Sequence, residues 1–319
     1  MSEPTAVSAA AKARTDDHIP SGVERVKPVS EKPRSLWSDA WDDLKRSPIF
    51  WISLFLMALF VFMAIAPQVF TSKDPTFCDL ANSRVSPSGQ AWFGYDAQGC
   101  DVYARTIYGA RASISVGIAA SLVALFVGAG IGILAGFYGS ITDSILSRIT
   151  DIFFAIPIIL GSIIILTSFP TGANPSQALE ITKVSLAIAF LGWTSTQRIA
   201  RSSVIQLKGA DYVLAARSLG ASNWRIIRRH IIPNSLAPII VITTISLGGY
   251  IGAEATLSFL GIGLQPPVIS WGIQINDAQD YLRTSPYLLF FPALFLSLTV
   301  LSFIMLGDRI REALDPKLR

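Results

Sequence analysis

Long uncharged stretches constrain this chain more than any other feature. Six apolar runs contain only two charged residues between them, and they lie at 49–66, 113–137, 152–169, 184–200, 236–263 and 287–306. A bilayer core about 30 Å thick is crossed by about 20 apolar residues in a helix. Lipid cannot satisfy the free backbone groups of an open sheet, so the expected spans are helical. The sequence therefore predicts an all-α integral membrane protein with six transmembrane helices.

The distribution of positive charge predicts the orientation of these spans. If the amino terminus is cytoplasmic, 20 of the 26 Lys and Arg residues lie on the cytoplasmic side. This bias is the positive-inside rule, and it explains the net charge of +4 without a nucleic-acid partner. We expect a multi-pass protein of the cell membrane with both termini cytoplasmic. Residues 1–35 lack the apolar core of a signal peptide and predict a disordered tail.

The remaining boundaries follow from the spans. Residues 48–110 are expected to hold the first transmembrane helix and an extracytoplasmic loop, and residues 111–306 a five-helix core. Residues 307–319 are expected to form a cytoplasmic C-terminal tail. Residues 36–47 place Trp37, Trp41 and Leu44 on one helical face. This spacing predicts an amphipathic helix in the membrane interface, in contact with lipid. The alternative is that its tryptophans pack on neighbouring protein.

The two cysteines, Cys78 and Cys100, both fall in the predicted extracytoplasmic loop. An even pair in an oxidising compartment predicts a disulfide, because no other cysteine competes. The alternative is a pair of free thiols that share a loop.

Small and acidic residues inside the spans carry two further predictions. Gly128, Gly132 and Gly136 recur at four-residue spacing, which predicts close packing against another helix. Glu254, with Ser258 one turn later, lies well inside an apolar run. A carboxylate there must face protein or a wet cavity. It is either part of the translocation path or a structural group bonded to a neighbouring helix.

The segment from Arg198 to Pro233 is too long and too charged for a simple turn. Its first predicted helix runs from Asp211 to Leu219 and ends at Gly220. A second begins near Ser222 and is expected to carry Trp224, Ile227 and Ile231 on one face, with Pro233 closing the segment. Such a compact knob suits docking of a partner, or a basic helix pair lying on anionic lipid.

At this point the sequence resembles a known family. Ala215-Ala-Arg-Ser-Leu-Gly220, followed by Ile232-Pro233, is similar to the EAA loop of ABC importer permeases, with Leu214 at the usual glutamate position. Further segments resemble dipeptide and oligopeptide permeases in the same order, and the likeness covers about 36–319. These segments are Phe93-Gly-Tyr-Asp96, Gly109-Ala-Arg-Ala-Ser113, Arg148-Ile-Thr-Asp151, Glu254-Ala-Thr-Leu-Ser-Phe-Leu-Gly261 and Gly307-Asp-Arg309.

The resemblance implies the type I importer permease fold and a non-catalytic transport subunit. It implies a heterodimer with a second permease, two ATPase subunits that bind ATP and Mg²⁺, and an extracytoplasmic solute-binding protein. Peptides are the expected cargo, although the resemblance also allows nickel, opines or glycosides. The loop 201–233 would couple to the ATPase, through Asp211, Tyr212, Ala215, Ala216, Arg217, Leu219, Gly220, Ala221, Trp224, Arg225 and Arg228.

Other function classes find less support in the residues. The sequence has no Gx4GK[ST] phosphate loop, so no bound nucleotide or other cofactor is expected on this chain. Neither His18 nor His230 has a second metal ligand beside it, and no catalytic set converges. An ion-coupled carrier would need ionisable groups at mid-membrane, where only Glu254 qualifies. That carrier, and a non-transporting membrane scaffold, are the alternatives.

Overall fold

The computed structural model describes residues 36–170, 172 and 175–314. Within them the regular structure is helical, with isolated β-bridges only in the loop before Val102. The predicted tail at 1–35 lies outside the described residues, as do residues 315–319. Residues 307–314 form no separate tail, because they continue helix α11 (Tyr287–Leu314).

Helix α1 (Leu36–Leu44) is shorter than the predicted helix 36–47 and packs beside α11. The chain then turns, and the Ser47 hydroxyl accepts a hydrogen bond from the Phe50 N–H at the start of α2 (Pro48–Ile65). Pro48 takes the first helical position, where a missing N–H costs nothing. The Trp41 ring lies 6.2 Å from the Phe50 ring and is 52% exposed, so only part of it packs on protein.

Helices α3 (Val102–Tyr138) and α6 (Gln177–Lys208) form the most extensive helix–helix contact among the described residues. A Cβ added at Gly128, Gly132 or Gly136 would lie 2.5–2.9 Å from backbone carbonyl oxygens of α6. Real side chains do not approach backbone so closely, so only glycine permits this contact. The predicted close packing of these three glycines is confirmed.

The third predicted span, 152–169, is not one continuous helix. The chain forms α4 (Ser140–Phe154) and α5 (Ile158–Ser168), which meet at an angle of 84°. Pro157 lies in the break, where it has no N–H to donate and disfavours a helical conformation at Ile156.

The predicted count of six spans is therefore met only in part. By length and composition, α2, α3, the run Asn223–Phe259 and α11 can each cross a membrane, and α4 with α5 makes a fifth if the bent pair is one span. Helix α6 is 32 residues long but more polar. It buries Thr194, Thr196 and Gln197 against neighbouring helices rather than exposing them.

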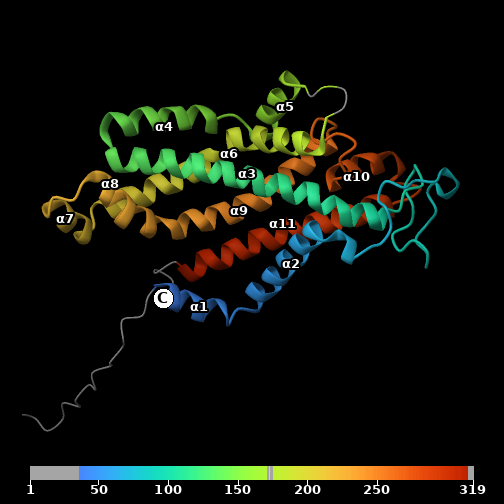
Figure 1. Ribbon diagram of the computed structural model, residues 1–319, viewed down its shortest axis with the longest axis horizontal. Helices are drawn as coiled ribbons and strands as arrows, with labels where there is room; N and C mark the ends of the chain where they lie inside the picture. The colour runs from blue at the N-terminus through green and yellow to red at the C-terminus, as the bar shows by residue number, and fades with distance from the viewer. Residues whose placement is uncertain (1–35, 171, 173–174, 315–319) are drawn as a thin grey trace, which may run out of the picture. The chain divides into compact units, whose positions relative to one another are not determined.

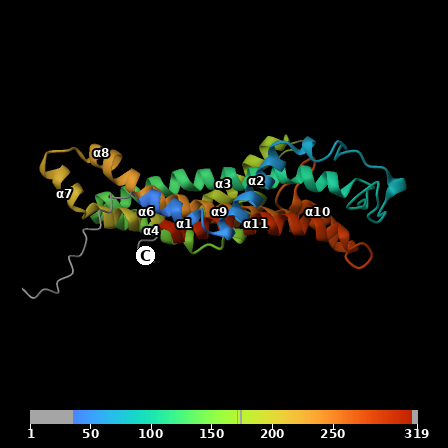
Figure 2. The same ribbon diagram turned by 90° about the horizontal axis from the view of Figure 1, so that it is seen from below.

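Helix α9 (Ile232–Phe259) lies between two apolar clusters. One cluster joins α9 to α3 and α6, and the other joins it to α2, α11 and α10 (Trp271–Ala278). Figures 1 and 2 show the short helices α7 (Asp211–Ser218) and α8 (Asn223–Ile226) at one end of this bundle, and α10 with the loop 66–101 at the other. We call residues 209–231 the knob and residues 66–101 the disulfide loop.

Candidate functional site

The knob is built on a small apolar core of its own. Helix α7 (Asp211–Ser218) buries Val213, and α8 (Asn223–Ile226) buries Ile226. These side chains pack with Ile227 and Ile231 against Phe137 of α3 and Val204 of α6. The knob is therefore anchored to the ends of α3 and α6 rather than hanging from them as a free loop.

The turn between the two knob helices follows the predicted pattern. Gly220 has φ +78°, a left-handed conformation that glycine adopts without strain. The Ala221 N–H donates to the Ala216 carbonyl oxygen, which closes the end of α7. The Ser222 hydroxyl then accepts from the Arg225 N–H and caps α8. The predicted helix end and the predicted cap are both confirmed.

The outer surface of the knob exposes large apolar side chains among arginines. Leu219 is 89% exposed and Trp224 is 67% exposed, and Tyr212 and Leu214 are exposed beside them. Arg217, Arg225 and Arg228 are exposed as well, and none of the three forms an ion pair with a described residue. Trp and Arg are enriched in the residues that dominate protein interfaces, so this surface suits a partner.

Most of the residues predicted to contact a partner lie on this surface. Nine are exposed: Asp211, Tyr212, Ala215, Arg217, Leu219, Gly220, Trp224, Arg225 and Arg228. Two are partly buried, Ala216 and Ala221, and both pack against the knob core.

Two details of the predicted knob are wrong. Trp224 does not share the buried face of Ile227 and Ile231; Ile226 does. Because both Ile226 and Ile227 face the core, the buried arc is centred between them and Trp224 falls on its flank. Pro233 does not close the segment either. Helix α8, the π-helical turn η3 (Ile227–Ile231), which we call the wide turn, and α9 form one continuous run from Asn223 to Phe259.

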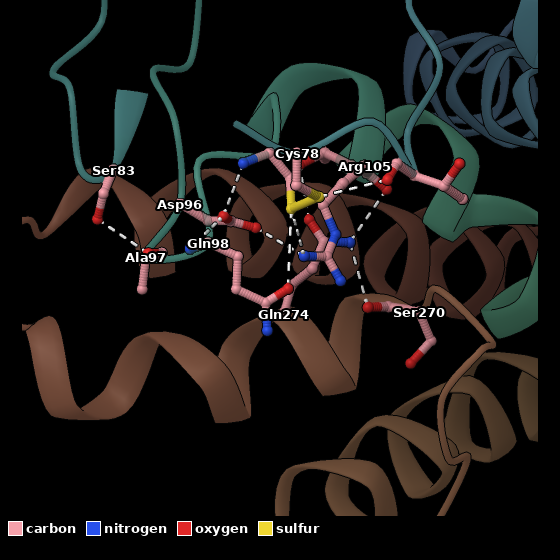
Figure 3. A network of polar contacts seen from close by, with 11 residues as sticks. Cys78, Ser83, Asp96, Ala97, Gln98, Arg105, Ser270 and Gln274 are labelled. Atoms are coloured by element: carbon pink, nitrogen blue, oxygen red, sulfur yellow. Dashed lines mark hydrogen bonds and ion pairs between the residues drawn. A yellow bond between two sulfur atoms is a disulfide. The ribbon is translucent and has the colours of Figure 1, made fainter. Parts of the chain in front are cut away.

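At the opposite end, the predicted disulfide is present. Cys78 and Cys100 are bonded, with 4.1 Å between their Cα atoms. Arg105 donates to the Asp96 carboxylate at 2.6 Å, and the same carboxylate accepts the Cys100 N–H at 2.9 Å (Figure 3). Lys73 forms a second ion pair, with Asp101 at 2.6 Å. The disulfide and the Lys73–Asp101 pair thus close the disulfide loop on itself just before α3, and the Asp96–Arg105 pair holds the loop to α3.

A polar cavity of about 410 Å³ opens beside this loop. It is lined by Asp96 and Arg105, by Gln274 and Asp277 of α10, and by Asp280. Burial raises the pKa of the Asp277 carboxyl group, because the surrounding protein desolvates its charged form. The positive charge of Arg105 lowers this pKa, and the negative charge of Asp96 raises it further. Sequence reasoning missed this cavity, because its lining comes from segments about 170 residues apart.

Glu254 and Ser258 are buried inside this chain. The Ser258 hydroxyl donates to the Glu254 carboxylate at 2.8 Å and accepts the Leu264 N–H at 3.0 Å. Ser113 of α3 and Ser270 are also buried beside the carboxyl group. The pair therefore braces the turn that joins α9 to α10, which favours the structural alternative over a surface on the translocation path.

The described residues contain no group of three or more His, Cys, Asp or Glu side chains able to hold a metal ion. They carry an anchored surface with exposed arginines at one end and a loop closed by a disulfide at the other. The fold is that of a helical protein with several membrane-spanning helices.

The comparisons with known proteins name the family. Residues 128–319 match the binding-protein-dependent transport system inner membrane components, and residues 35–87 match the N-terminal transmembrane domain of oligopeptide transport permease C. The chain belongs to this family of inner-membrane transport components. The predicted resemblance to ABC importer permeases is confirmed. The prediction of a non-catalytic permease subunit is confirmed with it, since the ATPase and substrate-binding proteins of this family are separate chains.

Relatives match over nearly the whole chain. The oligopeptide transport system permease protein OppC of Bacillus subtilis is 38% identical over 91% of this chain and 93% of its own length. The dipeptide transport system permease protein DppC of Alkalihalophilus pseudofirmus is 38% identical over 89% and 91%. The glutathione transport system permease protein GsiD of Pectobacterium atrosepticum is 34% identical over 90% and 93%.

A solved structure shares the fold. The MetNI methionine ABC transporter in an inward-facing conformation aligns with a TM-score of 0.51 and 19% identity. The alignment covers 66% of this chain and 95% of that one. At this identity the likeness concerns the fold alone.

Proposed function

We propose that this chain is one of two permease subunits of an ATP-driven importer of peptides, and that it couples to an ATPase subunit through the knob. One observation carries the coupling role: on a core shared with α3 and α6, the knob exposes Leu219, Trp224 and three arginines that form no ion pair within the described part of the chain. The peptide cargo is supported by the names of the relatives, which are oligopeptide, dipeptide and glutathione permeases.

The proposed partner surface follows from the chemistry of the knob. The exposed arginines call for acidic groups on the ATPase, and Leu214, Leu219 and Trp224 call for an apolar cleft between them. Leu214 stands where related loops carry a glutamate, so this contact is apolar rather than ionic. The ATPase subunits bind ATP and Mg²⁺, and the binding protein delivers cargo at the opposite end.

The orientation that goes with this function puts the knob and the described chain ends in the cytoplasm. Two contacts support a common side: Arg311 and Leu314 of α11 line a cavity with Gln206 of α6, and α1 lines another with Arg309. In this arrangement α6 also crosses the membrane and brings the number of crossings to six. Helix α1 lies in the inner interface against lipid, and the disulfide loop is extracytoplasmic.

A transport assay tests the energy source and the cargo. The assembled transporter is reconstituted in proteoliposomes, and uptake of labelled dipeptide, oligopeptide and glutathione is measured with and without ATP. We expect uptake of at least one peptide that requires ATP and survives a proton ionophore. Uptake that collapses with the ionophore and ignores ATP would instead favour an ion-coupled carrier.

A binding assay tests the knob. Trp224→Ala and Arg225→Glu should each reduce co-purification of the ATPase subunits. Arg283→Glu is the matched control, because Arg283 is exposed, has no described ion pair and lies near the opposite end. If the knob variants keep their ATPase but lose binding to anionic vesicles, the knob lies on lipid and the coupling role is wrong.

A further inference from the structure

The knob joins α9 through a helical turn that is wider than an α-turn. In η3 the Ile232 N–H donates to the Ile227 carbonyl oxygen, five residues back rather than four. A turn closed in this way holds one residue more than an α-turn, and such turns occur frequently at functional sites. The wide turn lies between the exposed surface of the knob and the membrane-spanning length of α9.

Two side chains just after the turn explain why it is wide. Pro233 has no N–H to donate to the Arg229 carbonyl, and in an α-helix its ring would collide with that carbonyl oxygen. Asn234 donates its side-chain Nδ2 to the His230 carbonyl oxygen at 2.6 Å. In an α-helix that carbonyl would accept the backbone N–H of Asn234 instead. Both side chains therefore favour the wide turn over an α-turn.

The wide turn determines which side of α8 faces the core. Ile227, Ile231 and Ser235 are all buried, at successive intervals of four residues. In an α-helix each such interval rotates the side chain by about 40° further around the axis. A wide turn between Ile227 and Ile231 removes most of this drift. An α-turn in its place would rotate α8 by about 100° relative to α9, because it holds one residue fewer.

We propose that Pro233 and Asn234 are positioning residues that hold the wide turn, and that this turn sets the rotation at which α9 presents the knob. The consequence for transport rests on the proposed coupling function. The rotation itself does not, so the two can be tested separately.

A distance measurement tests the rotation. Both cysteines of the chain are in the disulfide, so cysteines introduced at the exposed positions Leu219 and Ile240 are the sites open to a spin label. In the full-length chain in lipid nanodiscs, P233A/N234A should shift the distance between the labels by up to about 7 Å, the displacement of a helix surface rotated by one residue. Pro238→Ala is the matched control, since Pro238 lies in the same helix but away from the turn. Its distances should equal those of the parent.

A compensating deletion makes the test specific. If P233A/N234A converts the wide turn to an α-turn, deletion of Arg229 from the same variant removes the extra residue and should restore the parent distance. A loss of stability would not be repaired by a further deletion. If P233A/N234A leaves the distance unchanged, or the deletion fails to restore it, the proposal is wrong. Should the double variant fail to insert, Asn234→Asp keeps the side-chain shape, removes the donor and should broaden the distances.

A transport measurement tests the consequence. In proteoliposomes that hold the assembled transporter, P233A/N234A should lower solute uptake per ATP hydrolysed several-fold, and the added deletion of Arg229 should recover it. Recovery supports both the positioning role and the coupling role. If P233A/N234A shifts the label distance and the added deletion of Arg229 restores it, but uptake per ATP stays constant throughout, the positioning role is supported and the coupling role is wrong.

Discussion

Gly132 of α3 lies so close to α6 that a Cβ on the glycine would lie 2.6 Å from the backbone carbonyl oxygen of Gln197. Two long helices can make this contact only where one of them has no side chain. The pairing of α3 with α6, and with it the support beneath the knob, depends on this approach.

Gly132→Ala should therefore destabilise the protein by about 1–3 kcal/mol, the usual cost of overpacking. Gly130→Ala is the control, because a Cβ there meets nothing within 4 Å and alanine favours the helix. The unfolding temperature of the purified protein in detergent should fall for the first variant and hold or rise for the second. Equal values would show that α3 and α6 separate easily.

Replacement of Cys78 and Cys100 by serine should loosen the disulfide loop. For their separation of 22 residues, the loop-entropy model predicts that loss of the disulfide lowers the free energy of unfolding by about 3 kcal/mol. The loop should be cut faster by a protease added to the outer face, and reduction of the unmodified protein should have the same effect. Unchanged cleavage would mean that the Asp96–Arg105 and Lys73–Asp101 pairs hold the loop alone.

Glu254→Leu should cost about 1–3 kcal/mol, because it leaves the buried Ser258 hydroxyl without its acceptor. Glu254→Gln keeps an acceptor oxygen and should be milder. Unfolding temperature and uptake are measured for both. If Glu254→Gln keeps the unfolding temperature of the parent but loses uptake, the structural role is wrong and Glu254 belongs to the translocation path.

Gly220→Pro should disrupt the turn between α7 and α8, since proline fixes φ near −65° and the turn needs +78°. We expect normal insertion into the membrane, continued ATP hydrolysis and little uptake. Gly220→Asn is the control, because asparagine tolerates a left-handed conformation and a Cβ at this position meets nothing within 4 Å. Normal uptake by the proline variant would count against the docking role.

Asp277 predicts a pH dependence of stability at the end of the bundle that holds α10. Its pKa is raised in the folded protein. At a pH between the ordinary pKa and the folded-state pKa, the folded state therefore holds a proton that the unfolded state has released. Stability from this group is then present at low pH and falls as pH rises from its ordinary pKa through its folded pKa. Asp277→Asn should flatten that decline in unfolding temperature. Arg105→Gln should steepen it, because Arg105 lowers the pKa of Asp277. A flat profile in the unmodified protein would contradict the shift.

Features set by short-range chemistry could be predicted from the sequence. Gly220 and Ser222 marked a helix end and a helix start, because a left-handed turn and a hydroxyl cap act within four residues. The cysteine pair was predictable because no third cysteine offered a competing bond. The glycine spacing in α3 indicated a close contact, although not which helix would fill it.

Features that depend on competing neighbours could not be predicted. Helical spacing put Trp224 on one face with Ile227 and Ile231, but Ile226 and Ile227 both turn inward and leave the tryptophan exposed. The periodic pattern could not show that the chain bends sharply at Pro157 but continues as one helical run through Pro233, since the outcome depends on where each carbonyl finds a donor. Helix α6 carries polar residues that only burial against other helices makes acceptable.

The sequence by itself determined that this protein is helical, lies in a membrane and carries a basic loop with a glycine turn. Those properties follow from the lipid solvent and from interactions within one or two turns of chain. The tertiary structure decided which face of the knob is exposed, how α9 presents it and where Glu254 lies. Each of these depends on contacts between helices far apart in sequence, whose packing selects one rotation among several that local chemistry allows.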